Sequence, residues 1–310
     1  MQLGILFSGQ GAQKPGMGCD LLADETFSKT LEQASEAAEL DIVKLLKSEN
    51  GELNQTRYVQ PALAAFSLGI WHMLQRDLPN LPAAGMVGLS LGEYPALMAA
   101  ESLAIDAGFA LLKDRGQYMQ KAADEVASTL AAVIDPDIEQ VEKICAQLPD
   151  VWVANYNSPR QLVIGGTQAG IKEAVERLNA SQAAKRVIKL NVSGAFHTPL
   201  FDGARQQMKA RLCDVEFSQP KVPVISNTIV APFQAKETAA ILERQLAVPT
   251  HFGQDLQYLI EHQKIEGTLE IGPGKTLSKF AKQVDAGLKR EHIETRLDYE
   301  NFVKEHVQWS

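Results

Sequence analysis

The residues best suited to chemistry stand in the segment 88–92, Gly-Leu-Ser-Leu-Gly, where a serine lies between two glycines. An apolar run at 84–88 predicts a buried strand before it, and the pattern from 92 to 100 predicts a helix after it. Gly-x-Ser-x-Gly between a strand and a helix is typical of a nucleophile elbow. Such a turn presents the hydroxyl at a helix N-terminus, where free N–H groups favour negative charge. We therefore predict that Ser90 attacks a carbonyl carbon.

An attack of this kind needs two donors for the oxyanion that develops on the carbonyl oxygen. The backbone N–H of Leu91, directly after the nucleophile, is the first candidate. The loop after the first predicted strand, at 7–13, supplies the second in the backbone N–H of Gln10. Glycines on both sides of Gln10 permit the close approach that such a contact requires.

A serine nucleophile also needs a base, and six histidines are available. His197 differs from the others in its setting, the segment 192–200, Val-Ser-Gly-Ala-Phe-His-Thr-Pro-Leu. A loop with small residues and a proline can present an imidazole at a cleft. We predict that His197 is the base.

These residues require a scaffold that brings distant loops together. Apolar runs predict buried strands, and amphipathic patterns predict helices between them. Strands alternating with helices favour an α/β fold with a mainly parallel sheet and helices on both faces. The expected strands are 3–7, 84–88, 222–227 and 268–271; the expected helices are 24–46, 61–74 and 92–100. The tail after Thr295 is polar, and we expect it to be peripheral.

The middle of the chain follows a different order, strand-helix-strand-strand-helix-strand, which is that of a ferredoxin-like α+β unit. Its expected elements are 129–134, 137–148, 151–156, 161–165, 168–180 and 186–190. We therefore expect a ferredoxin-like subdomain at 128–192, inserted into a catalytic domain formed by 1–127 and 193–310.

Composition limits the function classes. The 310 residues carry a net charge of -8, which argues against a nucleic-acid partner. No apolar run is long enough for a membrane span, and the first residues lack the pattern of a signal peptide. The three cysteines are scattered without a metal-ligand spacing, so no metal is expected. We expect a cytoplasmic enzyme.

Four segments together resemble one family. They are 7–13 (Phe-Ser-Gly-Gln-Gly-Ala-Gln), 88–94 (Gly-Leu-Ser-Leu-Gly-Glu-Tyr), 194–199 (Gly-Ala-Phe-His-Thr-Pro) and 270–274 (Glu-Ile-Gly-Pro-Gly). This set is similar to that of the malonyl-CoA:acyl carrier protein transacylases of fatty acid synthesis and the acyltransferase domains of polyketide synthases. The resemblance runs in order over about residues 1–290. It implies an α/β-hydrolase-like core that carries a ferredoxin-like subdomain, in agreement with the pattern of elements.

The resemblance also implies roles for individual residues. Ser90 and His197 match the nucleophile and the base of a Ser–His dyad, and Gln10 and Leu91 match the oxyanion-hole donors. Arg115 matches the arginine that binds the malonyl carboxylate. Two further positions, Asn157 and His251, are implied to bind substrate.

Two positions depart from the family pattern. The family commonly has histidine directly before the nucleophile, where this chain has Leu89. It often has glutamine at the position that aligns with His251. The backbone carbonyl that supports the catalytic histidine is expected near Thr250 or His251.

The implied reaction moves a malonyl group from malonyl-CoA to the phosphopantetheine thiol of acyl carrier protein, through an ester on the serine. Coenzyme A is then a substrate, and no bound cofactor is expected. A serine thioesterase or hydrolase, a transacylase for another carboxyacyl-CoA such as methylmalonyl-CoA, and a non-catalytic carrier-protein binding module are alternatives. An acidic carrier protein would need a local basic patch. The candidates are Lys185, Arg186 and Lys189, or Arg205, Lys209 and Arg211.

Overall fold

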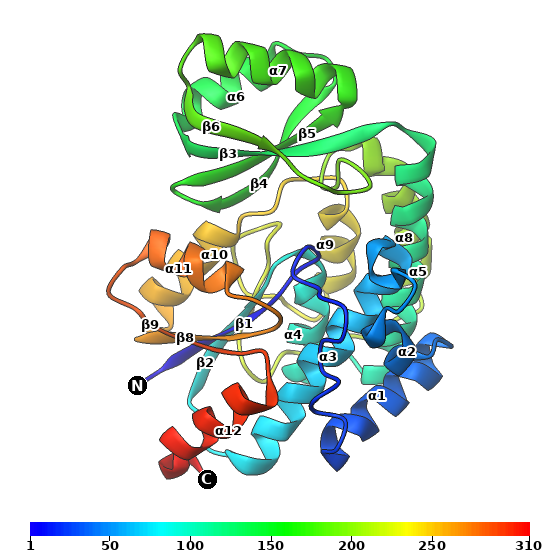
Figure 1. Ribbon diagram of the computed structural model, residues 1–310, viewed down its shortest axis with the longest axis vertical. Helices are drawn as coiled ribbons and strands as arrows, with labels where there is room; N and C mark the ends of the chain where they lie inside the picture. Colours follow the sequence, from blue (N-terminus) through cyan, green and yellow to red (C-terminus); the bar gives the residue numbers. More distant parts are fainter.

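The computed structural model describes all 310 residues and contains two separate sheets (Figure 1). The first sheet has five strands, all parallel to their neighbours. In spatial order they are β7 (Val224–Ile225), β2 (Ala83–Gly88), β1 (Leu3–Phe7), β8 (Gly267–Ile271) and β9 (Lys289–Ile293). The predicted mainly parallel sheet is confirmed, although its edge strand β7 is only two residues long.

Helices cover both faces of this sheet. One face packs against the largest hydrophobic core of the protein and the other against a smaller one, and successive residues of β1 show the division. Ile5 and Phe7 point into the large core, whereas Leu6 points into the small one. The helices of the large domain are α1 (Glu25–Ala38), α2 (Ile42–Lys47), α3 (Thr56–Asp77), α4 (Glu93–Ala99), α5 (Ile105–Glu125), α8 (Asp202–Leu212), α9 (Thr238–Gln245), α10 (Phe252–His262), α11 (Thr276–Val284) and α12 (Arg296–Glu305).

The second sheet is antiparallel and has the spatial order β4 (Val151–Ser158), β5 (Gln161–Thr167), β3 (Ser128–Pro136), β6 (Ala184–Lys189). Helices α6 (Ile138–Ala146) and α7 (Gln168–Ala180) cover one face with their own small core (Figure 1). This is the predicted ferredoxin-like arrangement, and the fold class is confirmed. The exact division into domains at 127/128 and 192/193 stays a prediction.

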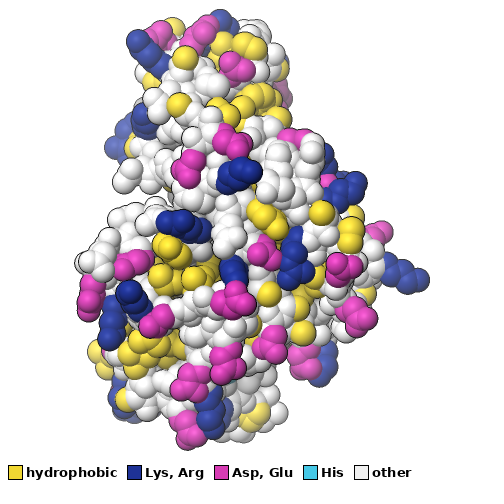
Figure 2. Space-filling model, turned by 90° about the vertical axis from the view of Figure 1, so that its right-hand side faces the viewer, with side chains coloured by type: hydrophobic (Ala, Val, Ile, Leu, Met, Phe, Trp, Pro, Cys, Tyr) yellow, Lys and Arg dark blue, Asp and Glu magenta, His cyan; other side chains and the backbone are white.

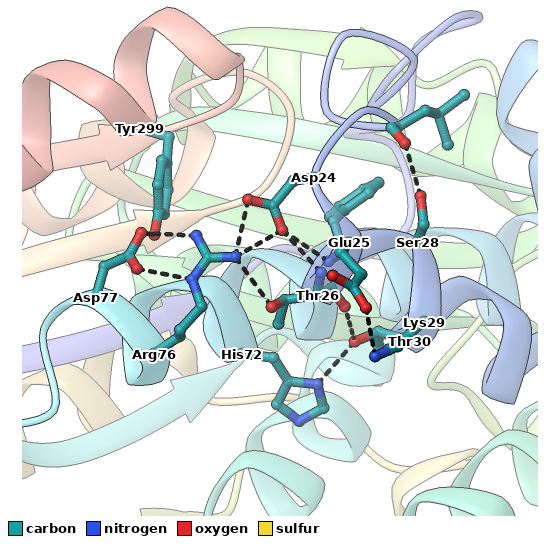
Figure 3. A network of polar contacts seen from close by, with 12 residues as sticks. Asp24, Glu25, Thr26, Ser28, Lys29, Thr30, His72, Arg76, Asp77 and Tyr299 are labelled. Carbon is teal, nitrogen blue, oxygen red and sulfur yellow. Dashed lines mark hydrogen bonds and ion pairs between the residues drawn. The ribbon is translucent and has the colours of Figure 1, made fainter.

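Two predicted segments differ from the structure. The helix expected at 24–46 is two helices, because Glu39 adopts a left-handed conformation with φ of 52° and ends α1. The tail after Thr295 forms α12, which buries Tyr299 and Phe302. Tyr299 also donates a hydrogen bond to Asp77 at the end of α3, within a polar network that includes Arg76 (Figure 3). The polar tail is therefore an ordered helix at the outside of the molecule that two buried aromatic side chains attach to the large domain. None of the helices has the length and apolar character needed to cross a membrane.

Candidate active site

Ser90 lies in a sharp turn after β2, as the first residue of the short 3-10 helix η2 (Ser90–Gly92), which leads directly into α4. Its φ of 55° lies in the left-handed region, which costs energy for a residue other than glycine. The flanking glycines make this turn possible. A Cβ atom on Gly88 would lie 1.9 Å from the carbonyl carbon of Gly92, and one on Gly92 would lie 2.3 Å from the carbonyl oxygen of Phe7. The strand, turn and helix predicted for the elbow are present.

The backbone of Ser90 is bonded to two side-chain amides. Its N–H donates to Oδ1 of Asn227 at 2.7 Å, and its carbonyl accepts from Nε2 of Gln245 at 3.0 Å. Both amide side chains are fully buried. The left-handed turn thus receives the hydrogen bonds that a regular strand or helix would otherwise supply.

The two N–H groups predicted as oxyanion donors have no acceptor within the protein. Gln10 and Leu91 both line the cavity next to Ser90. The Gln10 side chain donates to the hydroxyl of Thr56 at 3.0 Å, which fixes the loop. Gly9 lets this loop approach the elbow, because a Cβ there would lie 2.4 Å from the carbonyl oxygen of Leu89. Two free donors beside the hydroxyl are what an oxyanion hole requires.

His197 is buried and lines the same cavity as Ser90. Its Nδ1 lies 2.7 Å from the carbonyl oxygen of Gln245, which can only accept a hydrogen bond. Nδ1 therefore carries the hydrogen, and Nε2 is left as the proton acceptor. Burial, with a smaller contribution from the positive charge of Arg115, lowers the pKa of His197 to about 4. The imidazole is neutral at pH 7, as a base must be.

The carbonyl that supports His197 corrects the sequence alignment. It belongs to Gln245, at the end of α9, and not to the expected Thr250 or His251. A glutamine thus stands at the supporting position, six residues before His251.

Arg115 extends from α5 and is 1% exposed. One of its terminal nitrogens, Nη2, lies 3.1 Å from Oγ of Ser90. Its other hydrogen bonds reach the side-chain oxygens of Gln60, at 2.6 Å, and Gln245, at 2.8 Å. All three partners are neutral. Burial lowers the pKa of Arg115, but a guanidinium keeps its charge in proteins, so the site holds a positive charge without a directly bonded carboxylate.

These residues surround a cavity of about 380 Å³ between the elbow and the antiparallel sheet. Six of the seven predicted site residues line it: Ser90, His197, Gln10, Leu91, Arg115 and Asn157. Asn157 comes from β4, and its buried Oδ1 has no hydrogen-bond partner. Leu89, where the family commonly has histidine, also lines the cavity and makes that wall apolar.

The structure does not bring His251 to this cavity. Its ring stacks on Tyr156 at 5.0 Å, and its Nδ1 lies 2.9 Å from the carbonyl oxygen of Asn227. His251 therefore contacts Asn227, which binds the backbone of Ser90, and it does not line the cavity.

Three polar residues of the site were not identified from the sequence: Gln60, Asn227 and Gln245. None belongs to a recognisable motif. Gln60 lies in the interior of α3, Asn227 follows the two-residue strand β7, and Gln245 ends α9. Only their burial with full hydrogen bonding in the structure distinguishes them.

Comparisons with known proteins agree with this geometry. The family model described as acyl transferase domain matches residues 5–292. A malonyl CoA-acyl carrier protein transacylase of Staphylococcus aureus (strain MW2) is 34% identical over 95% of this chain and 96% of its own length. The enzyme of that name from Salmonella typhimurium is 35% identical over 91% and 93%.

Solved structures are similar over almost the whole chain. The MCAT of Streptococcus pneumoniae has a TM-score of 0.92 and 37% identity, with 98% of this chain and all of that chain covered. A malonyl-transacylase in complex with a type II PKS acyl-carrier protein has a TM-score of 0.93 and 30% identity, with coverage of 99% and 100%. The resemblance found in the four sequence segments is confirmed.

Proposed function

This chain belongs to the acyl transferase domain family, and we propose that it transfers malonyl groups from malonyl-CoA to acyl carrier protein through an ester on Ser90. It is an [acyl-carrier-protein] S-malonyltransferase that supplies extender units for fatty acid synthesis. Two relatives named malonyl CoA-acyl carrier protein transacylase match this chain over more than nine tenths of their length, and a structurally similar malonyl-transacylase was solved in complex with its acyl-carrier protein.

The observation that carries the choice of acyl group is the position of Arg115. Its guanidinium is buried beside the nucleophile and bonds only neutral oxygens. A planar guanidinium pairs with a carboxylate through two parallel hydrogen bonds, and a malonyl group ends in a carboxylate. A neutral acyl group would leave the buried charge without a counter-ion, which is costly. The site therefore selects a carboxylated acyl group.

Acylation follows from the arrangement around Ser90. His197 Nε2 takes the proton of the hydroxyl, and Oγ attacks the thioester carbonyl carbon. The carbonyl oxygen becomes an oxyanion, which the N–H groups of Gln10 and Leu91 bind. When the carbon–sulfur bond breaks, His197 returns the proton to the thiolate, and coenzyme A leaves as the thiol. One oxyanion donor contributes roughly 10²–10³ in rate.

Transfer repeats these steps in the opposite direction. The phosphopantetheine thiol of the carrier protein gives its proton to His197, and its sulfur attacks the malonyl-Ser90 ester. The serine oxygen leaves and recovers the proton from His197. Dividing one transfer into two ester exchanges is the gain of covalent catalysis. The proposal includes no bound cofactor, and it places the enzyme in the cytoplasm.

Intact-protein mass spectrometry after brief mixing with malonyl-CoA or acetyl-CoA tests the proposal. We expect a malonyl adduct on the wild type, none on Ser90→Ala and much less on Arg115→Ala. Mixing the adduct with carrier protein should move the malonyl group to its thiol. Equal labelling by acetyl-CoA would contradict the role of Arg115. Release of free malonate without transfer would instead identify a thioesterase.

A further inference from the structure

Asn227 uses every polar group that it has, and each one contacts a different part of the site. Its Oδ1 accepts the N–H of Ser90, and its Nδ2 donates to Oδ2 of Asp255 at 2.6 Å. Its own backbone N–H donates to Oε1 of Glu93, and its carbonyl accepts from the N–H of His251. The side chain is fully buried. A residue that only fills space would not need this set of bonds.

Ser90 and Asp255 together fix which way the amide faces. The backbone N–H of Ser90 can only donate a hydrogen bond, so the oxygen end of the Asn227 side chain must face it. The NH₂ end then faces Asp255, whose Oδ2 accepts from Nδ2. Asp255 and Glu93 are both 0% exposed, so neither can turn toward water and release the amide.

The second amide at the elbow is held from the same side. Glu93 accepts from the backbone N–H of Asn227 with one oxygen and from Nε2 of Gln245 with the other. The carboxyl group of Glu93 thus connects the backbone of Asn227 with the side chain of Gln245, the two residues whose side-chain amides bind the N–H and the carbonyl of Ser90. This places the strained turn in a closed set of hydrogen bonds.

We propose that Asn227 is a positioning residue for acyl transfer, whose amide, oriented by Asp255, holds the left-handed backbone of Ser90. The contact fixes the direction of the Ser90 hydroxyl and the place of the adjacent Leu91 N–H. Asn227 does not line the cavity, and Arg115 binds Gln60, Gln245 and Ser90 rather than Asn227. Loss of the amide should therefore slow the chemical step and leave substrate binding nearly unchanged. This inference rests on the proposed role of Ser90.

The test compares Asn227→Ala with the wild type in a rapid-quench measurement of malonyl-Ser90 formation. We expect the maximal acylation rate to fall 10-fold to 100-fold, and the malonyl-CoA concentration for half-maximal rate to change less than 3-fold. Thr30→Val is the matched control, because Thr30 is also buried and hydrogen-bonded, to Thr26 and His72, but lies away from the elbow on α1 (Figure 3). It should lower thermal stability and keep the wild-type rate.

A second variant covers the case in which Asn227→Ala does not fold. In the exchange Asn227→Asp with Asp255→Asn, one amide still faces one carboxylate, and an oxygen still faces Ser90. Asn227→Asp alone places two carboxyl groups together. The exchange should recover at least a third of the wild-type rate, and the single variant should not.

An Asn227→Ala protein that acylates at the wild-type rate would overturn the inference. If Asn227→Ala does not fold, an exchange variant as slow as Asn227→Asp would overturn it instead. Failure of the proposed function is distinguishable, because the wild type would then show no malonyl adduct at all.

Discussion

The guanidinium nitrogen Nη2 of Arg115 lies 3.1 Å from the hydroxyl oxygen of Ser90, and neither has a carboxylate bonded to it. The group proposed to bind the malonyl carboxylate and the proposed nucleophile are therefore in contact before substrate arrives. Both are carried by elements far apart in the chain, α5 and the elbow after β2.

This contact predicts an acyl preference that one substitution reverses. Arg115→Ala should lower the rate of malonyl labelling by roughly 10-fold to 100-fold, because a charge-assisted hydrogen bond contributes about 1.5–3 kcal/mol. Labelling by acetyl-CoA should stay the same or increase, since the unpaired charge is gone. The ratio of the two rates, measured by mass spectrometry on Ser90, checks this. A parallel fall in both rates would mean that Arg115 only supports the fold.

The lowered pKa of His197 predicts the pH dependence of acylation. The base must be neutral, and burial lowers its pKa to about 4. The rate at low malonyl-CoA concentration should be flat from neutral pH down to about pH 5 and fall tenfold per unit below pH 4. Stopped-flow acylation from pH 3.5 to 8 gives the profile. A midpoint near the ordinary value of 6.5 would show that His197 is exposed to water in solution.

The approach of the Gln10 loop to the elbow predicts a difference between two glycines. Gly9→Ala places a methyl group against the carbonyl oxygen of Leu89 and must displace the loop that carries the Gln10 N–H. We expect acylation to slow by up to roughly 10²-fold. Gly203→Ala on α8 meets no atom within 4 Å, and it should keep the rate and stabilise the protein by about 0.4–1 kcal/mol. Equal rates for both variants would argue against Gln10 as a donor.

The burial of Glu93 predicts a change of stability with pH. Burial raises its pKa from 4.5 to about 8, so the folded protein binds this proton more tightly than the unfolded chain. Its contribution to stability is full below pH 4.5 and is lost as the pH rises through 8. The melting temperature of Glu93→Gln, relative to wild type, should therefore rise between pH 5 and pH 8.5. A difference that stays constant would show that Glu93 is ionised throughout.

Charge on the surface predicts where the carrier protein docks. Arg205 forms ion pairs with Asp202 and Glu243, and Arg211 pairs with Asp114. Figure 2 shows acidic and basic side chains interspersed over the side of the molecule that carries α8. The other basic cluster, Lys185, Arg186 and Lys189, is exposed on the edge strand β6, and Leu190 directly after it lines the cavity. We therefore expect the carrier protein to dock at β6.

Reversing this β6 charge should weaken the second half-reaction alone. Lys185→Glu with Arg186→Glu should raise the KM for carrier protein by roughly 3-fold to 10-fold and leave that for malonyl-CoA unchanged. The exposed Lys209→Glu on α8 is the control and should change neither value. A larger rise in the KM for carrier protein with Lys209→Glu would indicate that the carrier protein docks on α8 instead.

The sequence was sufficient to predict the local geometry around three of the proposed site residues. The elbow at Ser90 and Leu91 and the glycine-flanked loop at Gln10 are present beside the cavity, because each signal lies within a few neighbouring residues. The catalytic roles of these residues stay predictions. The order of strands and helices predicted both sheets for the same reason. The assignment of Arg115 came from the resemblance, and the structure places that residue beside Ser90.

Contacts between distant segments could not be predicted in this way. Asn227 and Gln245 lie 137 and 155 residues from Ser90 in the chain, and no pattern of residue types marks them. The carbonyl that supports His197 belongs to the last residue of α9. The motif around His197 lies in another segment and cannot predict where that helix ends. The break between α1 and α2 at Glu39 was missed because a left-handed residue other than glycine has no strong sequence signal.

The shared cavity above Ser90 has a consequence for the life of the intermediate. Coenzyme A must depart before the carrier thiol can occupy the same space, so the malonyl group waits as an ester while no thiol is present. During that interval water is the competing nucleophile, and His197 is the base that would take its proton, although water is far less acidic than a thiol. The apolar wall formed by residues such as Leu89, Val163 and Phe196 limits how many water molecules reach the ester. The rate at which the malonyl ester is lost to hydrolysis therefore depends on how well this apolar wall excludes water, as well as on the Ser–His dyad.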